Sequence, residues 1–281
     1  MFRKFIAIIF AATCLHGYCD EVPDSVYEAD PYVLLMGEAD QAIADKKWDE
    51  AAQRLQDALA VKPNHPSNVL LLNNLAKVYS YQRQDSLALA TYNRALDIAP
   101  TMNILLLGRA KTYLALGRDR SAMADFEQVL QRDSISTEAR FYHGMLSLFS
   151  GNKKEAEKDF NTLARVAPKS IDTAIALSTL YSLTGRERQA IPYLEKLIET
   201  DPAVEYYATL AGCYLELGKL TEASGIISDG LKLYPADPEL YYYRAWLNRD
   251  RFLLDDAHAD AKRAIKLGAN KRKVDELFVD L

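Results

Sequence analysis

The sequence predicts an all-α fold built from about seven consecutive helix pairs that stack into a solenoid. Three observations predict it: a repeat of about 34 residues, glycines at recurring turns, and prolines that close the repeats. Seven alanines mark the repeat, spaced 33 to 37 residues apart: Ala51, Ala88, Ala122, Ala156, Ala190, Ala223 and Ala257. Self-similarity at a fixed period of this length is the signature of a stacked repeat architecture.

Residues of other types also recur at fixed distances from these alanines. Small residues stand twelve positions before the alanines, at Ala39, Ala76, Ala110, Gly144, Ser178, Ala211 and Ala245. Aromatic residues recur nine positions before and four positions after them, as at Tyr79, Tyr113, Tyr181, Tyr214, Tyr92, Phe126 and Phe160. Prolines stand twelve positions after them, at Pro63, Pro100, Pro168, Pro202 and Pro235. This pattern resembles the tetratricopeptide repeat (TPR), over residues 32–271 with units starting near residues 32, 69, 103, 137, 171, 204 and 238.

The resemblance implies a right-handed superhelical solenoid of helix-turn-helix units, and the residues support it on physical grounds. In the third unit, helices are expected over residues 103–116 and 120–131, on either side of Gly117. Gly151, Gly185 and Gly218 recur at the same turn, where a residue that tolerates positive φ ends a helix. Because one unit cannot bury its apolar face alone, the stacking of neighbours must supply the core.

Both ends of the chain differ from the repeats. Residues 1–19 combine Arg3 and Lys4 with a short apolar core, which is the layout of a secretory signal peptide, and residues 20–31 form an acidic tether. Residues 272–281 place Val274, Leu277 and Phe278 on one helical face, which predicts a capping helix on the last unit. The alternative for this segment is a detachable interaction helix.

The signal segment predicts an exported protein, periplasmic or otherwise extracytoplasmic and of a bacterial type. No later apolar run is long enough to span a bilayer, so we expect no transmembrane helix. Cleavage after Cys19 is the leading interpretation. Lipidation at Cys14 is the alternative, although Ala11 and Thr13 depart from the usual lipoprotein pattern. A lipid there would be the protein's only link to a membrane.

Composition and motifs argue against several function classes. A net charge of −5 argues against nucleic-acid binding, which needs a basic face. We find no phosphate loop, nucleophile elbow, acid/base couple or zinc spacing, so we predict no enzyme activity, cofactor, metal or small-molecule substrate. Cys213, between Gly212 and Tyr214, is expected to be a buried packing residue.

The resemblance implies that a protein or peptide partner binds the concave face, lined by the first helix of each unit. Carried onto this chain, the family's binding positions include Asn73, Lys77, Tyr81, Lys111, Phe141, Met145, Phe149, Tyr242 and Trp246. Phe141, Met145 and Phe149 form a stripe that either receives apolar anchors of the partner or packs in the core. Ile104 and Gly108 stand where the chaperone-tail-binding members need cations, which argues against that partner.

The function predicted from the sequence is therefore a non-enzymatic protein-interaction scaffold of the cell envelope. One alternative is a lipid-anchored assembly subunit of an envelope or outer-membrane machine. Another is a periplasmic chaperone for exported subunits, which would bind several apolar clients. The sequence leaves the partner and self-association open.

Overall fold

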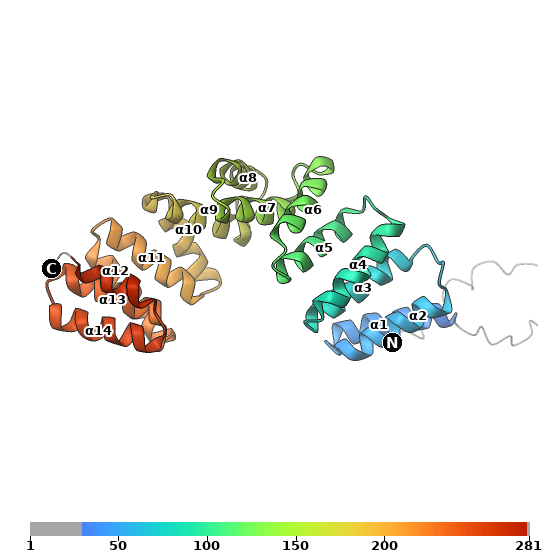
Figure 1. Ribbon diagram of the computed structural model, residues 1–281, viewed down its shortest axis with the longest axis horizontal. Helices are drawn as coiled ribbons and strands as arrows, with labels where there is room; N and C mark the ends of the chain where they lie inside the picture. The colour runs from blue at the N-terminus through green and yellow to red at the C-terminus, as the bar shows by residue number, and fades with distance from the viewer. Residues whose placement is uncertain (1–29, 280–281) are drawn as a thin grey trace, which may run out of the picture. The chain divides into compact units, whose positions relative to one another are not determined.

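The structure is a computed structural model that describes residues 30–279, and all its regular elements are helical (Figure 1). Within this range, seven pairs of helices are followed by one short helix. The pairs are α1 (Pro31–Ala44) and α2 (Trp48–Val61), α3 (Asn68–Tyr81) and α4 (Asp85–Ile98), α5 (Asn103–Ala115) and α6 (Asp119–Arg132), α7 (Thr137–Phe149) and α8 (Lys153–Val166), α9 (Ile171–Leu183) and α10 (Glu187–Thr200), α11 (Val204–Glu216) and α12 (Leu220–Leu233), and α13 (Pro238–Asp250) and α14 (Leu254–Leu267). The short helix α15 (Lys271–Asp275) continues as the 3₁₀ turn Glu276–Phe278. The predicted all-α class of paired helices is confirmed.

The described chain divides into two compact units, one ending at His65 and one beginning at Pro66. In the first unit, Asp30 caps α1 by accepting a hydrogen bond from the backbone N–H of Tyr32 at 3.0 Å. Lys62, just after α2, pairs with the same carboxylate and lies over the Tyr32 ring, 5.2 Å from its centroid. These contacts tie the start of α1 to the end of α2. The predicted signal peptide, Cys14 and residues 20–29 of the tether lie outside the described residues.

In the second unit, small residues let neighbouring helices approach until an aromatic ring touches backbone. A Cβ atom added to Gly108 on α5 would lie 2.4 Å from the ring of Tyr92 on α4. One added to Gly144 on α7 would lie 2.3 Å from the ring of Phe160 on α8. Both rings are buried, so each glycine faces a large side chain that fills the space a Cβ would need.

The turns inside the pairs share one backbone conformation. Gly117, Gly151, Gly185 and Gly218 all have positive φ, between 67° and 88°, as the sequence predicted. The same turn holds Lys46, Arg83 and Phe252 in the other three pairs, with φ between 57° and 61°. These three side chains therefore occupy a left-handed conformation that glycine adopts without steric cost.

In some pairs, a polar side chain on the first helix bonds to a buried carboxylate sixteen residues later on the second helix. Arg109 on α5 donates to Asp125 on α6 at 2.8 Å, and Arg244 on α13 donates to Asp260 on α14 at 2.5 Å. Between α7 and α8 the corresponding residues are His143 and Asp159. A buried carboxylate needs a charged or hydrogen-bonding partner, so each pair fixes how its two helices dock.

The cap packs on the last pair of helices. Val274 and Leu277 are buried against Ala245, Ala261 and Ala264, and the ring of Phe278 stacks on His258 with 4.4 Å between centroids. Earlier in the chain, Cys213 is buried, and this raises the pKa of its thiol to about 12. It is a packing residue, as predicted. No helix between residues 30 and 279 has both the length and the apolar character needed to cross a membrane.

Candidate functional site

A pocket of about 380 Å³ opens within the second compact unit, between α3, the α3–α4 turn, α4 and α5. It is lined by Lys77, Ser80, Tyr81, Arg83, Asp85, Tyr92, Gly108, Lys111, Thr112 and Ala115. The pocket therefore spans two neighbouring repeats. We call it the α3–α5 pocket.

Three cations (Lys77, Arg83 and Lys111) and one carboxylate (Asp85) line this pocket, and the cations differ in whether they form an ion pair. Lys111 donates to Glu138 at the start of α7, with 2.6 Å between Nζ and Oε1. Over the described residues, no carboxylate lies within 4.0 Å of the charged groups of Lys77 or Arg83, and both side chains are exposed. Two positive charges therefore remain for an anionic group to neutralise.

Packing and hydrogen bonds engage several groups in the walls of the pocket. Tyr92 is 2% exposed and packs on the backbone at Gly108, and burial raises the pKa of its hydroxyl to about 12. The hydroxyl of Thr112 donates to the carbonyl oxygen of Gly108 at 2.9 Å, and that of Ser80 donates to the carbonyl oxygen of Ala76 at 3.1 Å. Since these two hydroxyls already bond within their helices, the charged groups of Lys77 and Arg83 are the polar groups most open to a ligand.

The structure brings together three of the residues named from the sequence and separates a fourth from them. Lys77, Tyr81 and Lys111 line the α3–α5 pocket, whereas Asn73 is buried and does not line it. Asn73 donates to the side chain of Asn74 at 3.3 Å, and its Oδ1 atom has no hydrogen-bond partner. Sequence reasoning missed Arg83. The signal that marks it is an arginine at a turn where four other repeats carry glycine.

The predicted stripe on α7 divides between core and surface. Phe141 and Met145 are half-buried and pack against the cluster around Phe160 and Leu177. Phe149 at the end of the helix is 69% exposed. The three side chains of the stripe therefore differ in burial, and Phe149 is the most exposed of them.

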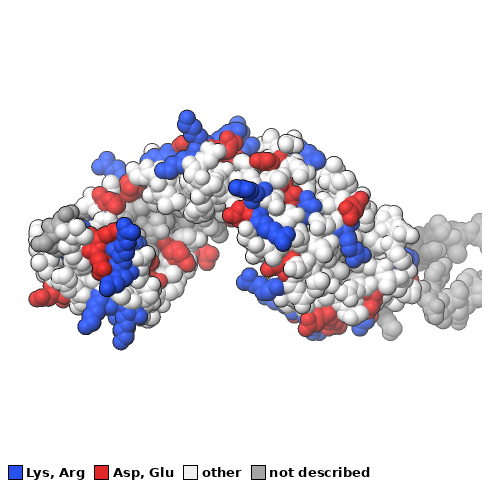
Figure 2. Space-filling view, in the orientation of Figure 1, with Lys and Arg blue, Asp and Glu red and all other residues white. Residues whose placement is uncertain are grey.

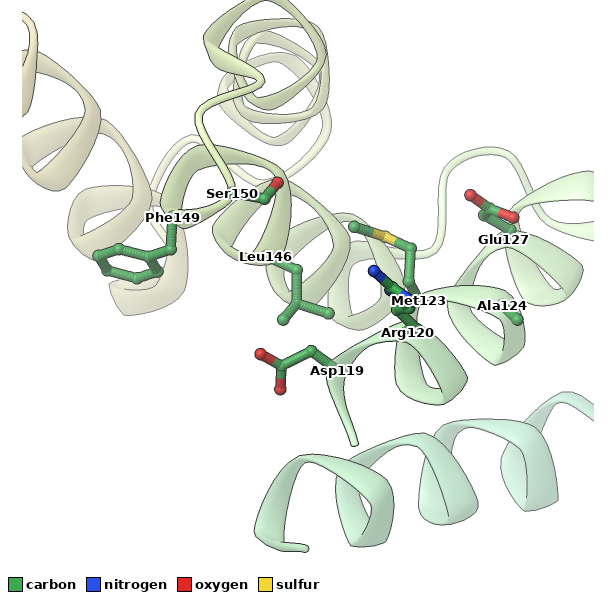
Figure 3. A pocket seen from close by; sticks show the side chains of 8 residues that line it. All are labelled: Asp119, Arg120, Met123, Ala124, Glu127, Leu146, Phe149 and Ser150. Atoms are coloured by element: carbon green, nitrogen blue, oxygen red, sulfur yellow. The ribbon is translucent and has the colours of Figure 1, made fainter. Parts of the chain in front are cut away.

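Phe149 borders a second pocket, of about 410 Å³, between α6 and α7. Figure 3 shows Leu146 pointing toward the α6 side chains, with Phe149 at the edge of the pocket. Its charged lining consists of Asp119, Arg120 and Glu127, so carboxylates outnumber cations there. We call it the α6–α7 pocket. Figure 2 shows basic and acidic side chains interspersed on the face in view, so the local charge of each pocket matters more than a broad field.

Tyr242 and Trp246 lie beneath the cap. Tyr242 is 7% exposed, and both rings pack with the cluster that contains Val274 and Leu277. Lys273 of α15 lies 4.2 Å from the centroid of the Tyr242 ring. The indole N–H of Trp246 donates to a carboxylate oxygen of Asp250 at 2.9 Å. The cap therefore buries Tyr242 and leaves Trp246 half-buried beside it.

Within residues 30–279, no three histidine, cysteine or acidic side chains cluster as metal ligands would. Polar clusters such as His143 with Asp159 join the two helices of a repeat and serve the packing of that repeat. The α3–α5 pocket itself offers charged and aromatic side chains.

Three stretches of the chain match family models that are described as Tetratricopeptide repeat: residues 32–101, 105–135 and 183–247. Together they cover more than half of the chain. Among solved structures, a tetratricopeptide repeat protein from Parabacteroides merdae ATCC 43184 is 25% identical, with a TM-score of 0.65 and coverage of 88% of this chain and 97% of that one. The type IV pilus biogenesis factor PilW is 19% identical, with a TM-score of 0.65 and coverage of 74% and 96%, and shows likeness of fold alone.

Curated relatives include the Homo sapiens protein DnaJ homolog subfamily C member 3, which is 27% identical over 55% of this chain and 34% of that protein. Another is the Tetratricopeptide repeat and J domain-containing co-chaperone DNJ1 of Cryptococcus neoformans, 25% identical over 64% of this chain and 36% of that protein. This chain thus spans about a third of the length of these relatives.

Proposed function

Because the chain belongs to the tetratricopeptide repeat family, we propose that it is a non-enzymatic scaffold that binds an acidic segment of a protein partner in the α3–α5 pocket. One observation carries the proposal: Lys77 and Arg83 lie exposed on that pocket with no carboxylate within 4.0 Å over the described residues. A carboxylate placed between them would make charge-assisted hydrogen bonds, which are roughly twice as strong as neutral ones.

The walls of the pocket supply the remaining affinity. Tyr81 is 64% exposed, so aromatic carbon is available beside the cations, and the buried Tyr92 packs against Gly108 beneath them. Aromatic side chains contribute large contact areas at little cost in conformational entropy. A segment that joins an apolar residue to an acidic one matches this combination.

The experiment compares partner capture by three forms of the full chain. The first is the unchanged protein, and the second is Lys77→Glu with Arg83→Glu. The third is a control with the same change in charge, Lys153→Glu with Lys154→Glu, on the exposed face of α8. Circular dichroism checks that all three are equally helical. We expect the pocket variant to lose a partner that the control retains. Equal capture by both variants would rule out the α3–α5 pocket.

A second candidate function, a chaperone that binds several clients, is supported by the relatives, one of which is named as a co-chaperone. This function predicts that the chain suppresses the aggregation of unrelated unfolded proteins. The scaffold function predicts one or two stable partners and no such suppression. A light-scattering assay with chemically denatured substrate proteins separates the two.

We also propose that the protein is exported and acts in the cell envelope, which rests on the layout of residues 1–19. Mass spectrometry of the mature N-terminus tests it. A new terminus at residue 20 supports soluble export, and a lipid-bearing terminus at Cys14 supports an anchored assembly subunit. An unprocessed Met1 would contradict both.

A further inference from the structure

The turn between α13 and α14 carries the most exposed large apolar side chain of the described residues. Phe252 is 83% exposed and has φ of 60°, and it stands where four other repeats have glycine. Leu253 and Leu254 follow it, 47% and 40% exposed. A bulky side chain in the left-handed region is strained, and such strain concentrates at sites of function.

The turn is held in place from within. Arg251 donates to the carbonyl oxygen of Leu220 at 2.8 Å, which ties the turn to α12. The backbone N–H of Phe252 donates to the carbonyl oxygen of Arg249 at 2.9 Å. These bonds hold the backbone of the turn, so little backbone conformational entropy is lost when it docks.

Two carboxylates follow the apolar residues. Asp255 and Asp256 are exposed in the first turn of α14, and no cation lies within 4.0 Å of either in the described part of the chain. Residues 252–256 thus read Phe-Leu-Leu-Asp-Asp, an apolar anchor joined to two unpaired acids. We call this segment the FLLDD turn. Its acids oppose binding to an anionic lipid surface.

The α3–α5 pocket has the complementary properties. It offers Lys77 and Arg83 without carboxylate partners, beside the rings of Tyr81 and Tyr92. The α6–α7 pocket is a poorer match, because Asp119 and Glu127 line it and would repel the two acids of the turn.

We propose that the FLLDD turn of one copy docks in the α3–α5 pocket of a second copy, so that the chain associates head to tail. This inference rests on the proposed function, since it names one occupant of the same pocket. The contact joins two different surfaces, so association remains open and grows with concentration rather than stopping at a closed pair. Since the contact involves few residues, the association is weak and sensitive to salt.

The experiment is sedimentation velocity of the full chain over a concentration series. We expect the weight-average mass to rise with concentration and to fall when salt is added. Lys77→Glu with Arg83→Glu should abolish the rise, and so should Asp255→Lys with Asp256→Lys. Phe252→Gly should also abolish the rise in mass with concentration. Because this change relieves strain in the turn, the loss of association would not reflect a loss of folding. The control Lys153→Glu with Lys154→Glu should associate as the unchanged chain does.

A mixture gives the sharpest result. The pocket variant keeps its FLLDD turn, which fits the unchanged pocket of the turn variant, and its reversed pocket fits the reversed turn of that variant. We expect each variant alone to stay monomeric and an equimolar mixture of the two to regain concentration-dependent growth. Combining both charge reversals in a single chain should restore concentration-dependent growth.

Other results would overturn the inference. A chain that stays monomeric throughout, while its pocket still captures an acidic partner, leaves the proposed function standing and removes this one. Self-association that survives both charge variants places the contact elsewhere. Phe252-dependent sedimentation with phosphatidylcholine vesicles, without self-association, assigns the turn to a lipid surface.

One result separates the two proposals in the opposite direction. If the pocket variant captures partners normally yet loses self-association, the inference stands and the proposed function fails.

Discussion

Nδ1 of His143 lies 2.5 Å from Oδ2 of Asp159, at a register where two other repeats join their helices by an arginine and an aspartate. Those pairs are Arg109–Asp125 and Arg244–Asp260. Arg140 donates to the second oxygen of Asp159, also at 2.5 Å. The α7–α8 pair is thus the one of these three whose link contains a group that titrates near neutral pH.

His143 is therefore expected to make stability fall as pH rises. The hydrogen bond to Asp159 raises the pKa of His143 above its ordinary value, and Glu127 and Glu155 act in the same direction, against burial. Its stabilisation is complete below the unfolded pKa of about 6.5 and is lost as pH rises through the higher folded pKa. Urea unfolding across this range measures the fall in the free energy of unfolding.

His143→Arg is the matched variant for this prediction, because arginine already fills the position at Arg109 and Arg244 and stays charged. Its free energy of unfolding should vary less between pH 6.5 and alkaline pH than that of the unchanged chain. Parallel curves for the two proteins would show that the His143–Asp159 pair does not govern the pH dependence.

Gly108→Ala is expected to destabilise the second compact unit by about 1–3 kcal/mol, the usual cost of overpacking. The new Cβ would lie 2.4 Å from the ring of Tyr92, which is buried and has little room to move. Gly225→Ala on α12 is the control, since nothing lies within 4 Å of a Cβ there. That change should raise the free energy of unfolding by about 0.5–1 kcal/mol. Equal effects of the two changes would contradict the close packing.

Phe252→Gly is expected to raise the free energy of unfolding by about 1 kcal/mol, because glycine adopts φ of 60° without the steric cost that phenylalanine carries. Gly218→Ala, at φ of 68° in open space, should lower it by about 1–2 kcal/mol. Thermal and urea unfolding measure both. If Phe252→Gly is destabilising instead, the exposed ring makes contacts that outweigh the strain.

Leu277→Ala is expected to release the cap. Leu277 is 7% exposed against Tyr242 and its neighbours, and Leu→Ala changes in cores cost about 2–5 kcal/mol. Because the cap is terminal, this loss of stability should appear as local opening of the cap. Amide hydrogen exchange should become faster in residues 271–278, and the fluorescence of Trp246 should change. Val279→Ala, at a side chain 73% exposed, is the control. Unchanged exchange in the Leu277 variant would contradict this account of the cap.

The sequence carried most of the information about local structure, because the repeat puts the same physical requirement at each unit. Gly117 shows this: a turn of this geometry needs positive φ, and glycine at the recurring position predicts it. The same reasoning could not tell which side chains of the α7 stripe (Phe141, Met145 and Phe149) are covered. Residues spaced by four drift by about 40° per step on a helix, so Phe149 is rotated by about 80° from Phe141. Small differences in neighbouring packing then decide which side chain is covered.

By itself, the sequence determined that this protein is a run of paired helices, where the four glycine turns fall, and that Cys213 packs in the interior. These features depend on local conformation and on burial periodicity, which neighbouring residues specify. Only the tertiary structure decided that Lys77, Arg83 and Lys111 share one pocket, that Phe149 leaves the core, and that the cap covers Tyr242. Each of these depends on how one helix docks on the next, and that docking is set by side chains from several repeats at once.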